Sequence, residues 1–230
     1  MASKKANENY IHNCGNDKVK IDNYIKSILR MGFSDIQLKN IINFYLCNTP
    51  MLKNDKNDSP FGLKTLKSYG WVGNQLSKLE GKLLKAANIG NFILIKSDRI
   101  DETLKNMDLS EKICIEHPRA VLKQNFSVTV KENGTANISE TETRMECLFR
   151  HIRNPIAHNH TYCFDNGNII LEDRDEKGII SAVILMPKQA LLEWIDIVDT
   201  KNICGITKGE EDVNNVKEEI AASCENIENN

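Results

Sequence analysis

The sequence predicts a mainly α-helical protein that carries one or two small β-hairpins and ends in a disordered acidic tail. Apolar residues recur at helical spacing along most of the 230 residues. Two short stretches alternate apolar and polar residues instead, which is typical of hairpin strands. Residues 208–230 contain seven acidic residues, two lysines and few apolar residues. Burial of so few apolar side chains cannot offset the entropy cost of ordering this tail.

Several helices are expected in the first half of the chain. Apolar residues lie three or four positions apart over 18–30, 35–47, 63–79 and 82–95. Ser34 stands where an N-cap would begin the second of these helices. A further helix is expected to start at 108–111, and Pro118 would close or kink it.

The hairpins and the last two helices are expected in the second half. Alternating residues over 126–138 surround the turn signal Asn133-Gly134, and a second hairpin is expected over 168–185. A helix capped by Ser139 would bury one apolar stripe. That stripe consists of Met145, Leu148, Phe149, Ile152 and Ile156. A last helix opens at Pro187, and its Trp194 is expected in the core, as is Trp71, rather than on a base-stacking surface.

Length and cysteine usage indicate one cytoplasmic domain. Residues 1–16 are expected to be a flexible N-terminus, 17–204 a single helical domain and 205–230 the disordered tail. The seven cysteines form no Cys-x-x-Cys pair, which favours reduced thiols and argues against a structural zinc site. We therefore expect no metal and no cofactor. No stretch of 18 apolar residues exists, so no membrane segment is expected.

The charge balance permits local contacts with RNA without indicating a general nucleic-acid surface. The formal net charge is −2 for the whole chain. Without the acidic tail, residues 1–207 have 28 basic and 25 acidic residues, a net charge of +3. A protein that coats nucleic acid would be far more basic.

The candidate site is the segment Arg150–His160, which contains three histidines and two arginines. On an ideal helix, Arg153 and His158 would lie about 7.5 Å apart along the axis and about 140° apart around it. They would therefore face different neighbours unless the helix distorts. Pro155 favours a bend or an end of the helix, because it lacks an amide hydrogen and crowds the carbonyl of His151.

Spacing alone is weak evidence for a site. An arginine followed by a histidine five or seven residues later occurs three times here, once from Arg144 and twice from Arg153. The structural alternative is a terminal helical turn whose charges complement the helix dipole. Likewise, Glu142 and Glu146 are expected on a solvated face rather than as partners of the arginines.

The segment nevertheless resembles the signature helix of HEPN domains, in which an apolar helix ends in Arg, a polar residue, a few residues and then His. Arg153-Asn154-Pro155-Ile156-Ala157-His158 fits this pattern. The resemblance covers about residues 140–200, where the hairpin around 166–173 and the closing helix 187–199 are similar to a plasmid-borne bacterial HEPN family. It implies an HEPN-like helical bundle that forms a homodimer with a composite site.

The resemblance also implies an activity, namely metal-independent endoribonuclease action of the toxin or phage-defence kind. His158 would transfer the proton when the RNA 2′-hydroxyl attacks the phosphate. Arg153 would hold that phosphate, and Asn154 would orient one of the Arg153 donors. The pattern favours His158 for this proton transfer, and His160 is the alternative. The implied partners are RNA, a second copy of the chain, and an antitoxin or defence-system protein.

Two other classes of protein remain open. A catalytically inactive HEPN module would bind RNA or a partner protein without cleavage. A purely structural dimerisation domain would bury Arg153 and His158 in ion pairs. The burial and the partners of these two side chains therefore test the structural hypothesis, while RNA cleavage in EDTA separates the nuclease from the inactive module.

Overall fold

A six-stranded mixed sheet runs through the computed structural model, which describes residues 10–14, 17–21, 24–51, 64–90, 92–95, 118–130 and 136–206. Its strands, in spatial order, are β3 (Tyr24–Lys26), β8 (Thr161–Phe164), β9 (Asn168–Arg174), β10 (Ile180–Pro187), β5 (Arg119–Lys123) and β4 (Phe92–Ile95). Neighbouring strands are antiparallel except β4 and β5, which are parallel.

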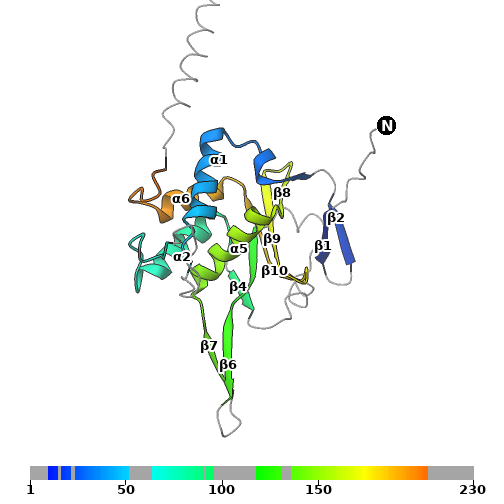
Figure 1. Cartoon of the computed structure of the whole chain (residues 1–230). Helices are drawn as coiled ribbons and strands as arrows, with labels where there is room; N and C mark the ends of the chain where they lie inside the picture. The colour runs from blue at the N-terminus through cyan, green and yellow to red at the C-terminus, as the bar shows by residue number, and fades with distance from the viewer. Residues whose placement is uncertain are drawn as a thin grey trace, which may run out of the picture.

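Two antiparallel hairpins lie outside this sheet. One pairs β1 (Tyr10–Cys14) with β2 (Asp17–Ile21), and the other pairs β6 (Phe126–Val130) with β7 (Ala136–Glu140). In Figure 1 the β6–β7 hairpin projects from the body of the molecule as a two-stranded arm. Its two ends therefore connect the sheet, through β5, to the helix that follows β7.

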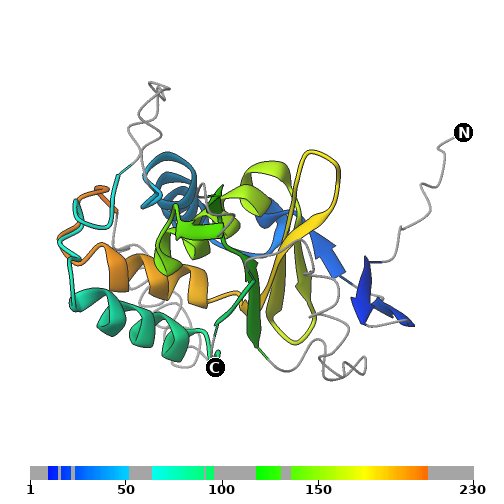
Figure 2. The same ribbon diagram turned by 90° about the horizontal axis from the view of Figure 1, so that it is seen from below.

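The helices of the described ranges gather on one side of the sheet (Figures 1 and 2). They are η1 (Ile28–Arg30), α1 (Asp35–Ile42), its continuation η2 (Asn43–Cys47), α2 (Gln75–Ala86), α5 (Arg144–His158) and α6 (Ala190–Val198). The α5 helix packs on β9, β5 and β10, while α6 contacts β10, α1 and α2. None of the helices in the described ranges is long and apolar enough to cross a membrane.

Both faces of the central strands are buried. Ile169 and Leu171 of β9 face the helices and belong to the main apolar core, with Ile184 of β10. Ile170 and Val183 lie on the opposite face and are also buried. Strands that are covered on both faces have continuous apolar runs instead of alternating ones.

This sheet shows that the prediction of a mainly α-helical, HEPN-like bundle is wrong. The expected helix over 18–30 is replaced by β2, β3 and η1, and the end of the expected helix over 82–95 is β4. The apolar residues of these short segments fit helical spacing, but periodicity alone cannot distinguish a short buried strand from a helix. The helix expected at 108–111 and the tail over 208–230 lie outside the described residues.

Other elements are confirmed. Ser34 caps α1 in a capping box with Gln37, and α1 with η2 spans the expected range 35–47. The hairpins appear as β6–β7 and β9–β10. The last helix forms, although it begins at Ala190 because Pro187 is the final residue of β10. Trp194 is fully buried as expected, whereas Trp71 is only half-buried.

Candidate functional site

The α5 helix that carries the candidate segment begins with a reciprocal cap. The hydroxyl of Thr143 accepts a hydrogen bond from the backbone N–H of Glu146, and the Glu146 carboxylate accepts one from the backbone N–H of Thr143. The helix thus begins four residues later than the cap expected at Ser139. Its predicted apolar stripe is buried, which fixes the rotation of α5 against the sheet.

The α5 helix continues through Pro155 to His158, so the prediction that Pro155 ends the helix is wrong. The proline ring is buried, and its carbonyl accepts hydrogen bonds from the backbone N–H groups of Asn159 and His160. Asn159 adopts the left-handed conformation, with φ 60°, that commonly closes a helix. Because α5 stays helical throughout, Arg153 and His158 keep the separation of about 140° around the axis that an ideal helix imposes.

The structure does not join the two residues of the Arg-x4-His pair. Within the described residues, no hydrogen bond or ion pair links Arg153 to His158. Arg153 is half-buried, and among these residues its Nε atom is buried without a hydrogen-bond partner. His158 is exposed at the C-terminal end of α5. The expectation that a structural domain would bury both side chains in ion pairs is therefore not met.

The structure instead brings His158 near His160, which follows the helix and is half-buried. Partial burial is the main cause that lowers the pKa of His160 below its ordinary value. The charge of Glu172 opposes this effect, whereas the charges of Lys26, Arg174 and His158 add to it. His160 is therefore mostly neutral at pH 7, in the form that can accept a proton.

Two strands, β3 and β9, supply the charged neighbours of His160. Lys26 ends β3, and its Nζ atom lies 5.8 Å from the ring centroid of Tyr162 on β8. On β9, the Arg174 Nε donates a 2.6 Å hydrogen bond to Glu172, whose side chain is fully buried. The sequence pattern did not indicate that Lys26 or β9 lies near the end of α5. Antiparallel pairing of β3 with β8 and of β8 with β9 brings these residues close to His160.

Asn154 is hydrogen-bonded to a buried carboxylate. Its Nδ2 atom donates a 3.0 Å hydrogen bond to the Oδ2 atom of Asp173 on β9. The same oxygen lies 2.6 Å from Nδ1 of His151, and both His151 and Asp173 are buried. His151 is one of the three histidines of the candidate segment, but the sequence did not indicate that it is buried. The sequence also contains no signal that Asp173 is its partner.

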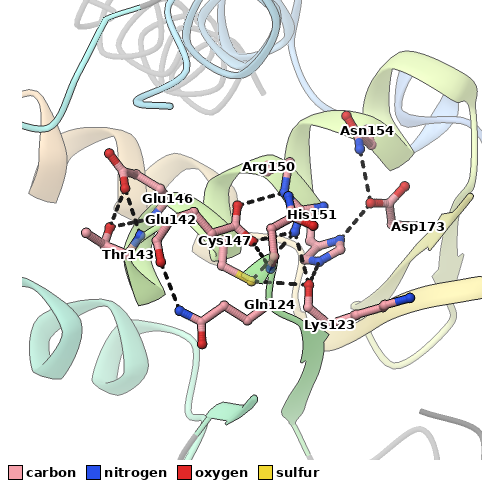
Figure 3. A network of polar contacts seen from close by, with 11 residues as sticks. Lys123, Gln124, Glu142, Thr143, Glu146, Cys147, Arg150, His151, Asn154 and Asp173 are labelled. Atoms are coloured by element: carbon pink, nitrogen blue, oxygen red, sulfur yellow. Dashed lines mark hydrogen bonds and ion pairs between the residues drawn. The ribbon is translucent and has the colours of Figure 1, made fainter. Parts of the chain in front are cut away.

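A second group of contacts fixes the base of the β6–β7 hairpin to α5 (Figure 3). The Arg150 guanidinium donates hydrogen bonds of 2.9 Å and 2.7 Å to the two carboxylate oxygens of Glu142. Glu142 also accepts a bond from the backbone N–H of Asn125, and its own carbonyl accepts one from Gln124. Glu142 and Glu146 are both buried, so the prediction that they lie on a solvated face is wrong.

The Glu142–Arg150 pair predicts a pH-dependent stability. Burial alone would raise the pKa of Glu142, but hydrogen bonds from Arg150 and the Asn125 backbone, with the charges of Arg150 and His151, hold it below its usual range. A lowered pKa in the folded state stabilises the fold above the unfolded pKa and loses that effect as the pH falls through the folded value. The stabilisation is therefore complete at neutral pH and decreases from about pH 5 downward.

We expect Glu142→Gln to lower the free energy of unfolding by about 1–3 kcal/mol at pH 7, because the charge-assisted bonds are lost. The difference from wild type should shrink as the pH falls below about 5. Urea unfolding at pH 7 and pH 3.5 measures both effects. Glu80→Gln is the matched control, since its 2.7 Å pair with Arg144 is more exposed and should contribute less than about 1 kcal/mol. Equal losses in the two variants would contradict the prediction.

The arrangement at the end of α5 can bind an anion and transfer protons. It offers a mostly neutral imidazole, a second exposed imidazole and the cations Lys26 and Arg174, with Glu172 as a buried counter-charge. Among the described residues, no three His, Cys, Asp or Glu side chains are grouped as a metal site would require. Comparisons of this chain with protein-family models, with curated proteins and with solved structures find no match.

Proposed function

We propose that the protein is a metal-independent endoribonuclease that cleaves RNA at the C-terminal end of α5. The observation that carries the proposal is the pairing of exposed His158 with half-buried His160 beside Lys26 and Arg174. Two imidazoles near cations supply what transfer of an RNA phosphate to its own 2′-hydroxyl needs. The resemblance of Arg153–His158 to HEPN domains supports the proposal through this segment alone, because the sheet differs from their bundle.

In the proposed reaction, neutral His160 accepts the proton of the 2′-hydroxyl while the 2′-oxygen attacks the phosphorus. The bond from phosphorus to the 5′-oxygen breaks, and protonated His158 donates its proton to that oxygen. The products are a 2′,3′-cyclic phosphate and a free 5′-hydroxyl, so atoms and charge balance without another reactant. Lys26 and Arg174 attract the phosphate, and their positive charge opposes its developing negative charge.

Arg153 enters this proposal through a second copy of the chain. It lies on a different side of α5 from His158, so one chain does not present both to the same phosphate. A homodimer in which two α5 ends meet would bring Arg153 of one copy to the histidines of the other. Its permanent charge and planar set of donors suit a phosphate, and its buried Nε atom has no partner among the described residues.

The test is cleavage of a mixed RNA pool in EDTA by the wild-type protein and by Arg153→Ala. We expect wild-type protein to produce new ends that ligate as 2′,3′-cyclic phosphates, and Arg153→Ala to produce few. Mixing Arg153→Ala with a histidine-deficient variant should restore part of the activity if the site is composite. Equal cleavage by the wild-type protein and by Arg153→Ala would indicate a contaminating nuclease and would contradict the role given to Arg153.

The second candidate is a catalytically inactive module that binds RNA or a partner protein, such as an antitoxin or a defence-system component. The separation of Arg153 from His158 around α5 favours it, and the amide of Asn154 is already engaged by Asp173. This candidate predicts retention of RNA or partner in a binding assay without any cleavage, and no change in that binding on His158→Ala.

The charges around His160 lead to a separate prediction for Lys26→Gln. Removing this cation should raise the pKa of His160, because a nearby positive charge disfavours the protonated imidazole. Protonated His160 cannot act as a base, so the loss of cleavage should be larger at pH 6 than at pH 8, where only the attraction of Lys26 for the phosphate is missing. An NMR titration of His160 measures the pKa directly and does not depend on activity. Lys177→Gln, at an exposed lysine in the turn before β10, is the control and should leave the titration unchanged; an unchanged titration in Lys26→Gln would contradict the prediction.

A further inference from the structure

The buried ring of His151 is held at both nitrogens, which is the feature from which the inference starts. Its Nδ1 atom lies 2.6 Å from Asp173 Oδ2, and its Nε2 atom lies 2.8 Å from the backbone carbonyl oxygen of Lys123 (Figure 3). The side chain of His151 is fully buried and that of Asp173 is 4% exposed. The two contacts connect α5 with β9 on one side and with the end of β5 on the other.

The donors and acceptors of this site require a hydrogen on each side of the ring. A carbonyl oxygen only accepts, so Nε2 must carry a hydrogen toward Lys123. A nitrogen and a carboxylate oxygen 2.6 Å apart would repel each other if only lone pairs faced one another, so a hydrogen also lies between Nδ1 and Oδ2. Oδ2 has a second donor, Asn154, whose Nδ2 atom can only donate to it.

We infer that His151 and Asp173 are positioning residues that hold the side chain of Asn154, and with it the Arg153–His158 end of α5, in one orientation. The inference rests on the proposed function, since it assigns these residues to the same site. The bridging hydrogen makes Asp173 Oδ2 an acceptor for Asn154, and this fixes which atom of the Asn154 amide points inward. The amide oxygen of Asn154 then points away from Asp173 (Figure 3).

Two charged groups lie close to the His151–Asp173 pair. Glu142 interacts electrostatically with His151 and Arg150 with Asp173, and Glu142 and Arg150 are paired with each other. Arg150 and Cys147 also donate to the Lys123 carbonyl, at 3.0 Å and 3.6 Å, so three donors from α5 meet at this oxygen. The Asp173 carboxylate is the charge that faces His151 from β9.

Stability alone is a poor explanation of this pair. Buried ion pairs contribute little net stability, because the cost of removing both charges from water offsets their attraction. The apolar stripe of α5, including Leu148, Phe149 and Ile152, already packs this helix onto the sheet. The pair instead fixes the orientation of Asn154, because the hydrogen bonds allow only one arrangement of the His151, Asp173 and Asn154 side chains.

The decisive variant is Asp173→Asn, which keeps the size of the side chain. An amide nitrogen in the place of Oδ2 would donate to His151 Nδ1 and would then oppose the donating Nδ2 of Asn154. Asn154 must rotate its amide or leave, which displaces the site. We expect kcat for RNA cleavage to fall on the order of 10²-fold with KM within about twofold, as for a misplaced catalytic group. Asp196→Asn, at an exposed aspartate of α6, is the matched control.

A double-mutant cycle separates positioning from general loss of structure. Asn154→Ala should lower kcat to a similar extent, and the double variant Asn154→Ala with Asp173→Asn should fall no further, because both act through one contact. Additive losses would overturn the inference. Asn154→Ala removes one donor to Asp173 but leaves both side chains of the buried pair in place, so the test remains if Asp173→Asn fails to fold.

A spectroscopic arm distinguishes failure of this inference from failure of the proposed function. In the protein without RNA, nitrogen-resolved NMR at pH 7 should detect hydrogens on both ring nitrogens of His151, or one shared with Asp173. Asp173→Asn should lose the Nδ1 signal and shift the side-chain amide of Asn154. Absence of the bridging hydrogen in the wild type would overturn the inference even if RNA is cleaved. If the bridging hydrogen is present but no RNA is cleaved, the proposed function is overturned, and His151 and Asp173 serve only to hold α5 on the sheet.

Discussion

Replacing either His158 or His160 by alanine is expected to lower the rate of RNA cleavage by about 10²- to 10⁴-fold, the usual contribution of a positioned acid or base. His160→Ala should also remove the acid limb of the pH–rate profile, because His160 is the group that must lose its proton to act as a base. His158→Ala should leave that limb in place. Rates measured in EDTA between pH 5 and pH 8 test both statements.

Chemical rescue controls for structural damage in these variants. His158 is exposed, so its removal leaves a surface position that dissolved imidazole can reach. We expect added imidazole to restore part of the activity of His158→Ala, and less of the activity of His160→Ala, because His160 is half-buried. A His158→Ala protein that cleaves RNA within threefold of wild type would exclude His158 as the acid.

Trp194→Ala is expected to lower the free energy of unfolding by about 3–5 kcal/mol, because it leaves a large cavity in the core. Trp194 is fully buried on α6, and its indole N–H donates a 2.8 Å hydrogen bond to the carbonyl of Leu83 on α2. Its loss would therefore weaken the contact between these two helices and leave that carbonyl without its donor. Urea unfolding followed by circular dichroism measures the effect without depending on tryptophan fluorescence.

Trp71→Ala is the matched comparison. Its indole also donates to a backbone carbonyl, that of Val198, at 2.9 Å, but the side chain is only half-buried. A smaller cavity and continued access to water should make its loss clearly smaller. A loss below about 1 kcal/mol for Trp194→Ala, or a larger loss for Trp71→Ala, would contradict this assignment of the core.

The elements that could be predicted from the sequence are those with a local signal. The apolar stripe of α5 repeats over three turns, and Ser34 precedes α1 with the Gln37 partner that a capping box needs. The β6–β7 and β9–β10 hairpins join strands that are adjacent in the chain. Each of these signals lies within a short window, so neighbouring residues are sufficient to indicate the structure.

The sheet could not be predicted in the same way. The β3 strand has three residues and pairs with β8, more than 130 positions later, and β4 pairs in parallel with β5 across a long connection. The β4 strand, Phe92–Ile95, is one continuous apolar run, so its residues do not alternate with polar ones. Without alternation, a strand of this length has no pattern that separates it from a turn or two of helix.

The candidate site likewise has one part that the sequence determined and one part that only the tertiary structure decided. The sequence by itself determined that Arg153, Asn154, His158 and His160 lie within eight residues around the end of one amphipathic helix, because helical periodicity and the residue types are local properties. Only the tertiary structure decided their partners. Antiparallel pairing of β3, β8 and β9 brings Lys26, Glu172 and Arg174 to His160, and packing of α5 on β9 brings Asp173 to His151 and Asn154. Such pairings depend on which distant strands become neighbours, and burial then sets the pKa of His160, so neither can be read from spacing along the chain.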